Sequence, residues 1–236
     1  MVRHRGRLTP AGLNTAVALL FVVGSACFVL GSVPGYLDAV GGPADGLTFF
    51  VGSIFFTTAS AGQLLQVQTP ALATASPETE HRHVHPRWRA WLPHDRGWMA
   101  AATQFPGTLF FNISTFAALA HNATAAHEDQ RVWRPDLFGS TLFLISGVYG
   151  VLAVSGAARS TDRLPSRIAW VNLLGCVLFM AAALASYVLP DGEDLDEVVS
   201  VAGTLLGAAC FLIGAALLLP AWDRAMHHST PEGEPT

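Results

Sequence analysis

Gly24-Ser25-Ala26-Cys27-Phe28-Val29-Leu30-Gly31 is the stretch that decides the fold, because its spacing recurs in every long apolar segment of the chain. Each segment carries a glycine, a phenylalanine four residues later and a small residue three further on. The six sets are Gly24/Phe28/Gly31, Gly52/Phe56/Ala59, Gly107/Phe111/Ser114, Gly139/Phe143/Ser146, Gly175/Phe179/Ala182 and Gly207/Phe211/Gly214. Steps of four and seven residues return to nearly the same side of an α-helix. The pattern therefore predicts helices that each carry a stripe in which a phenyl ring lies between two shallow notches.

The composition is typical of a membrane protein. Of the 236 residues, 51% are hydrophobic and 13% are charged, which is too apolar for an ordinary water-soluble domain. A helix that crosses a bilayer needs about 20 mostly apolar residues. The segments that meet this need lie near 14–36, 46–68, 99–120, 136–157, 168–189 and 198–220. We expect an all-α membrane protein with six transmembrane helices.

The first of these segments also resembles a secretory signal, since Arg3, Arg5 and Arg7 precede an apolar run. It carries the same glycine and phenylalanine stripe as the other five, however, and a cleaved peptide would not need that stripe. We therefore interpret 14–36 as a helix of the mature protein.

The arginines divide unequally between the two predicted sides. Eleven of the thirteen fall in the amino terminus, the 69–98 and 158–167 loops and the tail, whereas Arg131 and Arg134 fall on the other side. Because cytoplasmic loops carry the excess of basic residues, both termini are predicted to be cytoplasmic. The organisation that follows is a cytoplasmic segment at 1–13, three related transmembrane hairpins at 14–68, 99–157 and 168–220, cytoplasmic loops at 69–98 and 158–167, and a cytoplasmic tail at 221–236.

The stripes are best explained as packing surfaces. Helices in lipid associate through close contact, and small residues let two backbones approach. Phenylalanine would then fill the space between the notches. The alternative reading of the stripe is a groove for a lipid or another ligand.

Amide side chains are the main polar groups inside the apolar segments. On the predicted topology, the amides near the cytoplasmic ends of their spans are Gln63, Gln66, Gln104 and Asn172. A fifth amide, Asn112, lies near mid-membrane. The four either bond neighbouring helices or line a polar cavity open to the cytoplasm. Asn112 either makes an interhelical bond or marks a permeation path. Pro106, six residues before it and followed by Gly107, predicts a kink in the third span.

Histidine gives the one metal hypothesis. His81, His83 and His85 alternate in the proline-, histidine- and arginine-rich loop at 69–98, and neutral imidazoles bind zinc, copper or nickel. The alternative is a solvated loop. No ionisable side chain falls at mid-depth, and the sequence lacks the motifs of metalloproteases, serine hydrolases and phosphate-binding loops. We expect no catalytic residue, no enzymatic activity, no cofactor and no nucleic-acid partner.

The chain resembles a known family over most of its apolar length. Residues 21–32 (FVVGSACFVLGS), 133–146 (WRPDLFGSTLFLIS) and 169–179 (AWVNLLGCVLF) are similar to the helical hairpins of YrhK-like bacterial membrane proteins, and especially to longer six-span actinobacterial relatives. The resemblance implies a multi-pass protein of the bacterial inner membrane and implies no catalytic residue. The 69–98 loop lies outside it.

Together these features predict a non-catalytic structural or accessory component of the membrane, whose partners are the lipid bilayer and either another membrane protein or a second copy of this chain. The alternative is a transporter of small solutes or divalent metal ions that uses a polar cavity in the inner leaflet. A continuous polar path past Asn112 would favour transport, and a bundle sealed by phenylalanine would favour the accessory role.

Overall fold

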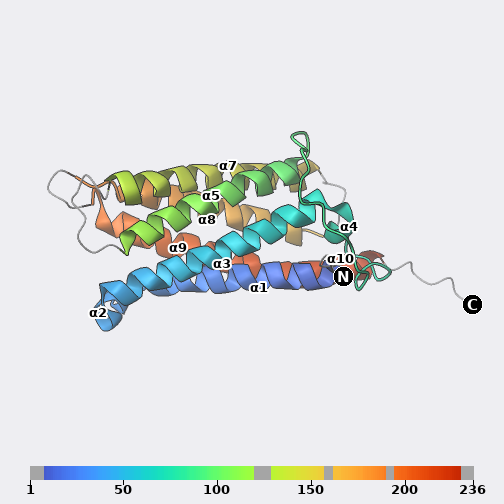
Figure 1. Ribbon diagram of the computed structural model, residues 1–236, viewed down its shortest axis with the longest axis horizontal. Coiled ribbons are helices and arrows are strands. Elements are labelled where there is room, and N and C mark those ends of the chain that lie inside the picture. The colour runs from blue at the N-terminus through green and yellow to red at the C-terminus, as the bar shows by residue number, and fades with distance from the viewer. Residues whose placement is uncertain (1–7, 120–128, 157–161, 190–193, 230–236) are drawn as a thin grey trace, which may run out of the picture.

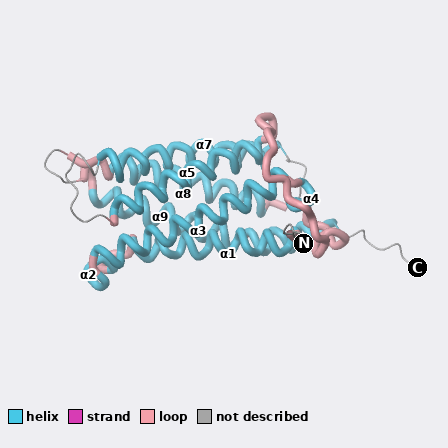
Figure 2. Tube along the Cα trace, viewed as in Figure 1, coloured by secondary structure: helices cyan, strands magenta, loops and turns pink. Residues whose placement is uncertain are grey.

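The computed structural model describes residues 8–119, 129–156, 162–189 and 194–229, and in these ranges the chain is helical apart from its connecting loops and two isolated β-bridges (Figure 2). The long helices lie roughly side by side along one axis (Figure 1). The elements in chain order are α1 (Pro10–Gly31), α2 (Tyr36–Val40), α3 (Gly42–Gln68), α4 (Pro70–Ala73), α5 (Arg96–Ala118), the π-helix η1 (Asp129–Trp133), α7 (Arg134–Gly156), α8 (Leu164–Ala185), α9 (Glu197–Ala216) and α10 (Leu218–Ser229).

Local sequence explains where several helices begin. Thr9 Oγ1 accepts a hydrogen bond from the Gly12 amide at 3.2 Å, Asp95 caps α5 through the Trp98 amide at 2.8 Å, and Asp196 caps α9 through the Val199 amide at 3.0 Å. A side-chain oxygen at this position satisfies one of the free amides of the first turn. Each of these helices therefore starts at a residue type that favours a start.

Several boundaries differ from the sequence-based expectation by a few residues, and three of these differences bear on the predicted organisation. α1 ends at Gly31, before residue 36, because Pro34 disfavours helix at Val33 and Gly35 adopts a φ of +85°. α8 starts at Leu164, inside the range predicted as loop, with Pro165 in its first turn. The predicted tail begins inside α10, whose residues form a short helix that continues from α9.

Five helices of the described chain are long and apolar enough to cross a membrane: Pro10–Gly31, Gly42–Gln68, Gln130–Ser155, Leu164–Ala185 and Glu197–His227. α5 is not among them, because Gln104, Pro106 and Asn112 interrupt its apolar sequence. The helix itself is uninterrupted and runs through Pro106.

The six long helices form a closed ring. Each helix contacts the next in the order α1, α3, α5, α7, α8 and α9, and α9 contacts α1 to close the ring. Helices adjacent in sequence form antiparallel pairs, α1 with α3, α5 with α7 and α8 with α9 (Figure 1). Contacts within these pairs are more extensive than those at the interfaces between pairs, α3–α5, α7–α8 and α9–α1, which we call seams. The ring therefore consists of three similar antiparallel pairs.

Each pair is joined by a close contact of its two stripe glycines. A β-carbon on Gly24 would lie 3.0 Å from the Gly52 carbonyl oxygen, and one on Gly52 would lie 3.1 Å from that of Gly24. The contact is also reciprocal between Gly175 and Gly207, where a β-carbon on either would lie 3.1 Å from the carbonyl oxygen of the other. In the second pair, a β-carbon on Gly139 would lie 3.1 Å from the Gly107 carbonyl oxygen, and one on Gly107 would lie 2.8 Å from the Phe143 ring. Only glycine lets the backbones approach so closely. Each phenylalanine covers the glycine of the opposite helix.

The residue after each first glycine packs toward the seams between pairs. It is always small and almost fully buried; the six are Ser25, Ser53, Thr108, Ser140, Cys176 and Ala208. Ser53 Oγ lies 3.0 Å from Thr115 Oγ1 across the α3–α5 seam, and Ser140 Oγ donates to the Phe179 carbonyl at 3.5 Å across the α7–α8 seam. One short motif thus supplies contacts to both neighbours of its helix.

Helix geometry explains why this motif closes a ring. Two neighbours in a six-membered ring lie roughly 120° apart around a helix, and consecutive residues lie about 100° apart. The glycine therefore faces one neighbour and the next residue faces the other. The phenylalanine, four positions after the glycine, returns to about 40°, between the two neighbours and toward the ring axis.

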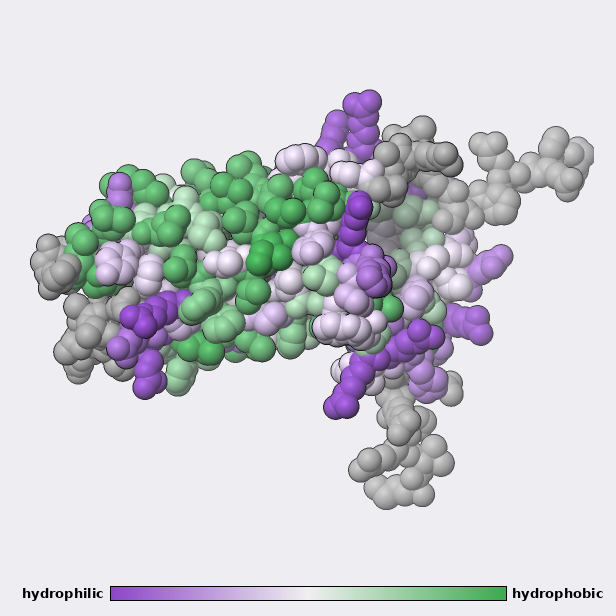
Figure 3. All heavy atoms as spheres, turned by 90° about the horizontal axis from the view of Figure 1, so that it is seen from above, coloured by the Kyte–Doolittle hydropathy of each residue, from purple (hydrophilic) through white to green (hydrophobic). Residues whose placement is uncertain are grey.

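The two ends of the ring differ in charge. The arginine-rich end is formed where α1, α5 and α8 begin and α3, α7 and α9 end, together with α10, and it holds the described residues Arg82, Arg87, Arg89, Arg96, Arg163, Arg167 and Arg224. The acidic end carries α2 and η1, with Asp38, Asp45, Asp129, Asp136, Asp196 and Glu197. Hydrophobic side chains cover the middle of the face between them, and hydrophilic groups gather toward the ends (Figure 3).

Candidate functional site

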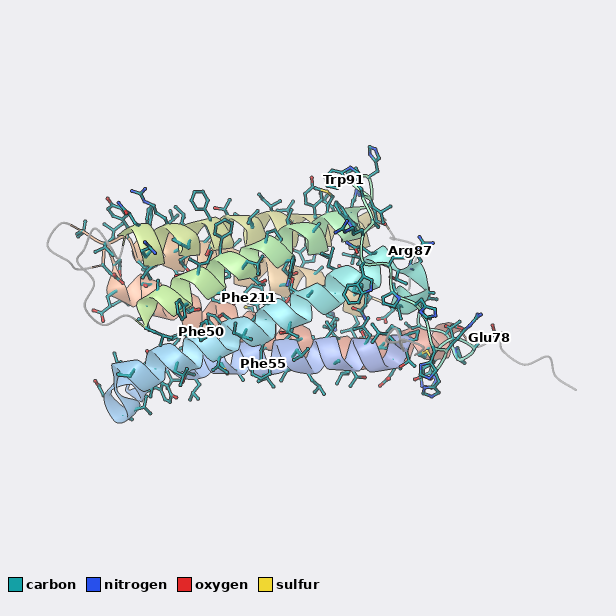
Figure 4. The ribbon with its side chains drawn as sticks, in the orientation of Figure 1. Phe50, Phe55, Glu78, Arg87, Trp91 and Phe211 are labelled. Atoms are coloured by element: carbon teal, nitrogen blue, oxygen red, sulfur yellow. The ribbon has the colours of Figure 1, made fainter. Side chains whose placement is uncertain are left out.

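Six phenyl rings fill the ring axis and form what we call the phenylalanine plug: Phe28, Phe56, Phe111, Phe143, Phe179 and Phe211. None is more than 8% exposed. The rings nearer the arginine-rich end, Phe56, Phe143 and Phe211, form a triangle with centroid separations of 5.8–6.4 Å. The other three lie nearer the acidic end. Figure 4 shows Phe211 within the bundle.

The two layers of the plug are joined within each helix pair. The centroids of Phe28 and Phe56 are 5.8 Å apart, those of Phe111 and Phe143 are 5.0 Å apart, and those of Phe179 and Phe211 are 5.2 Å apart, all with edge-to-face geometry. Such arrangements match the electrostatic preference of aromatic rings. The plug therefore fills the axis with ring-to-ring contacts.

A cavity of about 310 Å³ lies on the arginine-rich side of the plug, and we call it the amide chamber. The triangle of Phe56, Phe143 and Phe211 forms its floor, and residues of all six long helices and of α10 line its walls. Its amide side chains come one from each helix pair: Gln63 from α3, Gln104 from α5 and Asn172 from α8. None of the described lining residues is an acid, an arginine or a histidine.

Gln104 and Asn172 occupy equivalent places in the three-fold pattern. Each lies three residues before the first glycine of its pair, at about 60° around the helix and therefore toward the axis. In the first pair this place is taken by Phe21, which also lines the chamber. The three pairs therefore place a residue at the same position of the chamber wall, but the polarity of that residue differs from pair to pair.

The amides of the chamber do not form a hydrogen-bonded network with one another among the described residues. Gln63 Oε1 is buried and has no hydrogen-bond partner in the described part of the chain. Asn172 fits against α9 because Gly214 leaves room for it; a β-carbon there would collide with the amide oxygen. Burying the unpaired Gln63 oxygen costs free energy. Because that atom is shielded from the chamber too, the hydrogen-bonding groups that face the chamber are those of the Gln63 amino group, Gln104 and Asn172.

Gln66 and Asn112 do not line the chamber. Asn112 Oδ1 accepts a hydrogen bond from Thr57 Oγ1 at 3.1 Å, across the α3–α5 seam. Thr57 and Asn112 each follow the first glycine of their helix by five positions. Their side chains therefore lie at about 140° around the helix from that glycine and point away from the ring axis. Asn112 therefore contributes to helix association, and the axis at the level of the plug is lined by phenylalanine.

The histidines of the 69–98 loop do not converge. His81, His83 and His85 are exposed, and the described residues contain no group of three or more histidine, cysteine, aspartate or glutamate side chains that could hold a metal ion. The loop is attached by backbone bonds between Leu8 and Val84, at 2.8 and 3.1 Å, and by the Arg87 amide, which donates to Thr69 Oγ1 at 2.8 Å. Figure 4 shows Arg87 and Trp91 on this loop.

Sequence reasoning missed two parts of this architecture. The small residue after each first glycine is visible in all six segments, and its regularity could have predicted a second packing face. Phe21 and Gly150 of the chamber wall gave no such signal, because apolar and small residues at single positions are common in any membrane helix. Ser146 was interpreted only as a notch of the packing stripe.

Comparison of the chain with protein-family models, with curated proteins and with solved structures gave no match. The similarity to YrhK-like proteins stays a prediction.

Proposed function

We propose that this chain is an integral membrane protein that crosses the bilayer six times as three related hairpins, and that it serves as a non-catalytic structural or accessory component of the membrane. The observation that carries the proposal is the phenylalanine plug. A ring of helices whose axis is filled by six buried phenyl rings offers no polar path from one end to the other.

The sixth crossing is assigned to α5 on the basis of where its side chains point. Leu109, Ile113 and Phe116 are 42%, 51% and 64% exposed, whereas Thr108 is 1% exposed. Leu109, Ile113 and Phe116 of α5 therefore face outward, whereas Gln104 lines the chamber and Phe111 is buried in the plug. This distribution suits a helix surrounded by lipid on one side and by protein on the other, and it explains why mean hydropathy underrates α5.

The orientation follows from the charges of the two ends. The arginine-rich end is expected in the cytoplasm, together with both termini, and the acidic end outside. On the resemblance described above, the membrane is the bacterial inner membrane. The partners that this role requires are the surrounding lipid and either another membrane protein or a second copy of the chain.

A flux measurement tests the sealed axis. Proteoliposomes that contain the wild-type protein should retain small neutral solutes and ions as well as empty vesicles do. Replacement of the chamber floor, Phe56→Ala with Phe143→Ala and Phe211→Ala, should raise leakage, provided that the variant elutes as a monodisperse species. Saturable solute uptake by the wild-type protein would overturn the accessory role.

The second candidate, a transporter of small solutes, is favoured by one observation, the amide chamber beside the plug. Transport would require the plug to open and expose the chamber to the acidic end. The flux measurement separates the two candidates, because only a transporter moves solute while its phenylalanines are intact.

A further inference from the structure

We infer that the amide chamber is a binding site for one uncharged molecule that has an aromatic or other apolar body and hydrogen-bonding groups at its edge. The inference concerns what the chamber holds and does not depend on the number of membrane crossings or on the role of the whole protein.

The size of the chamber sets the size of the ligand. A cavity of about 310 Å³ would hold about ten water molecules at their liquid volume, and it lies at the lower end of the range of small-molecule pockets, about 300–1,000 Å³. A bicyclic ring system fits such a space. A whole phospholipid does not.

The lining sets the polarity of the ligand. Three phenyl rings form the floor and Phe21 adds a fourth to the wall, so the deep part of the chamber favours an apolar body. Gln104 and Asn172 each offer one carbonyl acceptor and an amino group with two donors, and Gln63 offers its amino group. Because no acid, arginine or histidine lies among the described lining residues, a charged ligand would be buried without a counter-charge, at a high cost.

The Gln63 amide is not explained by a bond that holds helices together. An amide whose purpose was to hold helices together would be bonded to a neighbouring helix, as Asn112 is to Thr57. The Gln63 oxygen is buried without such a bond among the described residues. Because that oxygen is closed off from the chamber as well, the group that Gln63 can offer a ligand is its amino group, beside the amides of Gln104 and Asn172.

Gly150 provides a way to close the chamber without disturbing the fold. It lines the chamber, it is helical, and a β-carbon built on it would meet no atom within 4 Å. Gly150→Leu should therefore place a side chain in the empty space. Val148→Leu is the matched control, since Val148 lies on the same helix and is 43% exposed.

The test uses the full chain in phosphatidylcholine nanodiscs and three probes of similar shape: 2-naphthamide, which is uncharged and hydrogen-bonding, 2-naphthoate, which is anionic, and naphthalene, which has no hydrogen-bonding group. Equilibrium dialysis against the probe, with empty nanodiscs as the blank, measures saturable binding. We expect one 2-naphthamide per chain and at least about tenfold weaker binding of the other two probes. Naphthalene cannot form the hydrogen bonds, and 2-naphthoate carries a charge that the chamber leaves unpaired.

The variants then locate the site. Gly150→Leu should abolish saturable binding and Val148→Leu should leave it unchanged. Gln63→Leu, Gln104→Leu and Asn172→Leu should each weaken binding about tenfold. If Gly150→Leu is not monodisperse, Ala169→Leu on the facing wall fills the same chamber from α8. The absence of saturable 2-naphthamide binding to the wild type, equal binding of 2-naphthoate, or full binding by a folded chamber-filling variant would each overturn the inference.

Discussion

The ring is closed in its middle and open near its arginine-rich end, although the same six helices build both regions. In the middle, glycine contacts draw each pair together and six phenyl rings fill the axis. Toward the arginine-rich end the same faces of the helices line a chamber that contains three amides. The comparison teaches that a repeated motif fixes the packing at one level of the bundle and leaves the next level free to vary.

Equivalent positions show this variation directly. Three residues before the first glycine of each pair stand Phe21, Gln104 and Asn172, and all three line the chamber. At the level of the plug, by contrast, all six positions hold phenylalanine. The plug therefore determines the fold, and the chamber is where residue identity differs between the pairs.

The largest effect is expected from breaking a glycine contact of the closed region. In Gly207→Val, the new β-carbon would lie 2.8 Å from Phe179 Cδ1 and 3.1 Å from the Gly175 carbonyl oxygen, and the backbone cannot give way cheaply. We expect overpacking of more than about 3 kcal/mol and loss of the monodisperse protein on size-exclusion chromatography. Gly150→Val, the same change beside open space, should remain folded. Equal behaviour of the two variants would contradict the difference between the regions.

A smaller loss is expected from removing one ring of the plug. Phe143 is 2% exposed and contacts the rings of Phe56, Phe111 and Phe211. Phe143→Ala should reduce the free energy of unfolding by about 3 kcal/mol, the low end of the range for soluble cores, because transfer into lipid is less unfavourable than transfer into water. Thermal unfolding in detergent measures the change. Phe138→Ala on the same helix removes a ring that is 57% exposed, and a similar loss in both variants would show that the plug has no special role.

An interhelical hydrogen bond outside the axis should contribute less. The Thr57 hydroxyl lies within hydrogen-bond distance of Asn112 Oδ1 of α5, at 3.1 Å, and of the Ser53 carbonyl of its own helix, at 3.0 Å. Its neighbour Thr58 donates to the carbonyl of Ile54 in its own helix. Thr57→Val should cost about 0.6–1 kcal/mol, in the range of such bonds in membranes. Thr58→Val should change stability less. Thermal unfolding of the two variants, with Asn112→Leu as the partner change, checks this, and an unchanged Thr57→Val would show that Asn112 has another role.

The smallest effect should have the opposite sign and lies in the chamber. Because Gln63 Oε1 is buried without a partner among the described residues, Gln63→Leu should raise stability by about 0.5 kcal/mol in the absence of ligand. Gln66→Leu, outside the chamber, serves as the control. A fall in the midpoint of thermal unfolding for Gln63→Leu alone would show that this amide holds helices together.

The sequence predicted the helices and the level at which they meet, because the glycine and phenylalanine spacing repeats six times. It did not predict which pairs become neighbours. The contact of α9 with α1, which closes the ring, follows from two faces on every helix, and only one of those faces was read from the stripe.

The chamber could be predicted only in part. Gln63, Gln104 and Asn172 were singled out as polar residues near one end, but Gln66 and Asn112 have the same chemistry and lie elsewhere. What separates them is their angle around the helix relative to the first glycine. That angle has meaning only once the direction of the ring axis is known.

The crossing by α5 is the most direct test of the account, since it is the helix that hydropathy leaves out. In a variant whose three cysteines are replaced by serine, Thr79→Cys in the loop before α5 and Gln130→Cys after it are labelled in intact cells with a membrane-impermeant maleimide. We predict that only Gln130→Cys reacts before the cells are lysed and that Thr79→Cys reacts afterwards. Labelling of both positions from the same side would contradict the six-crossing ring.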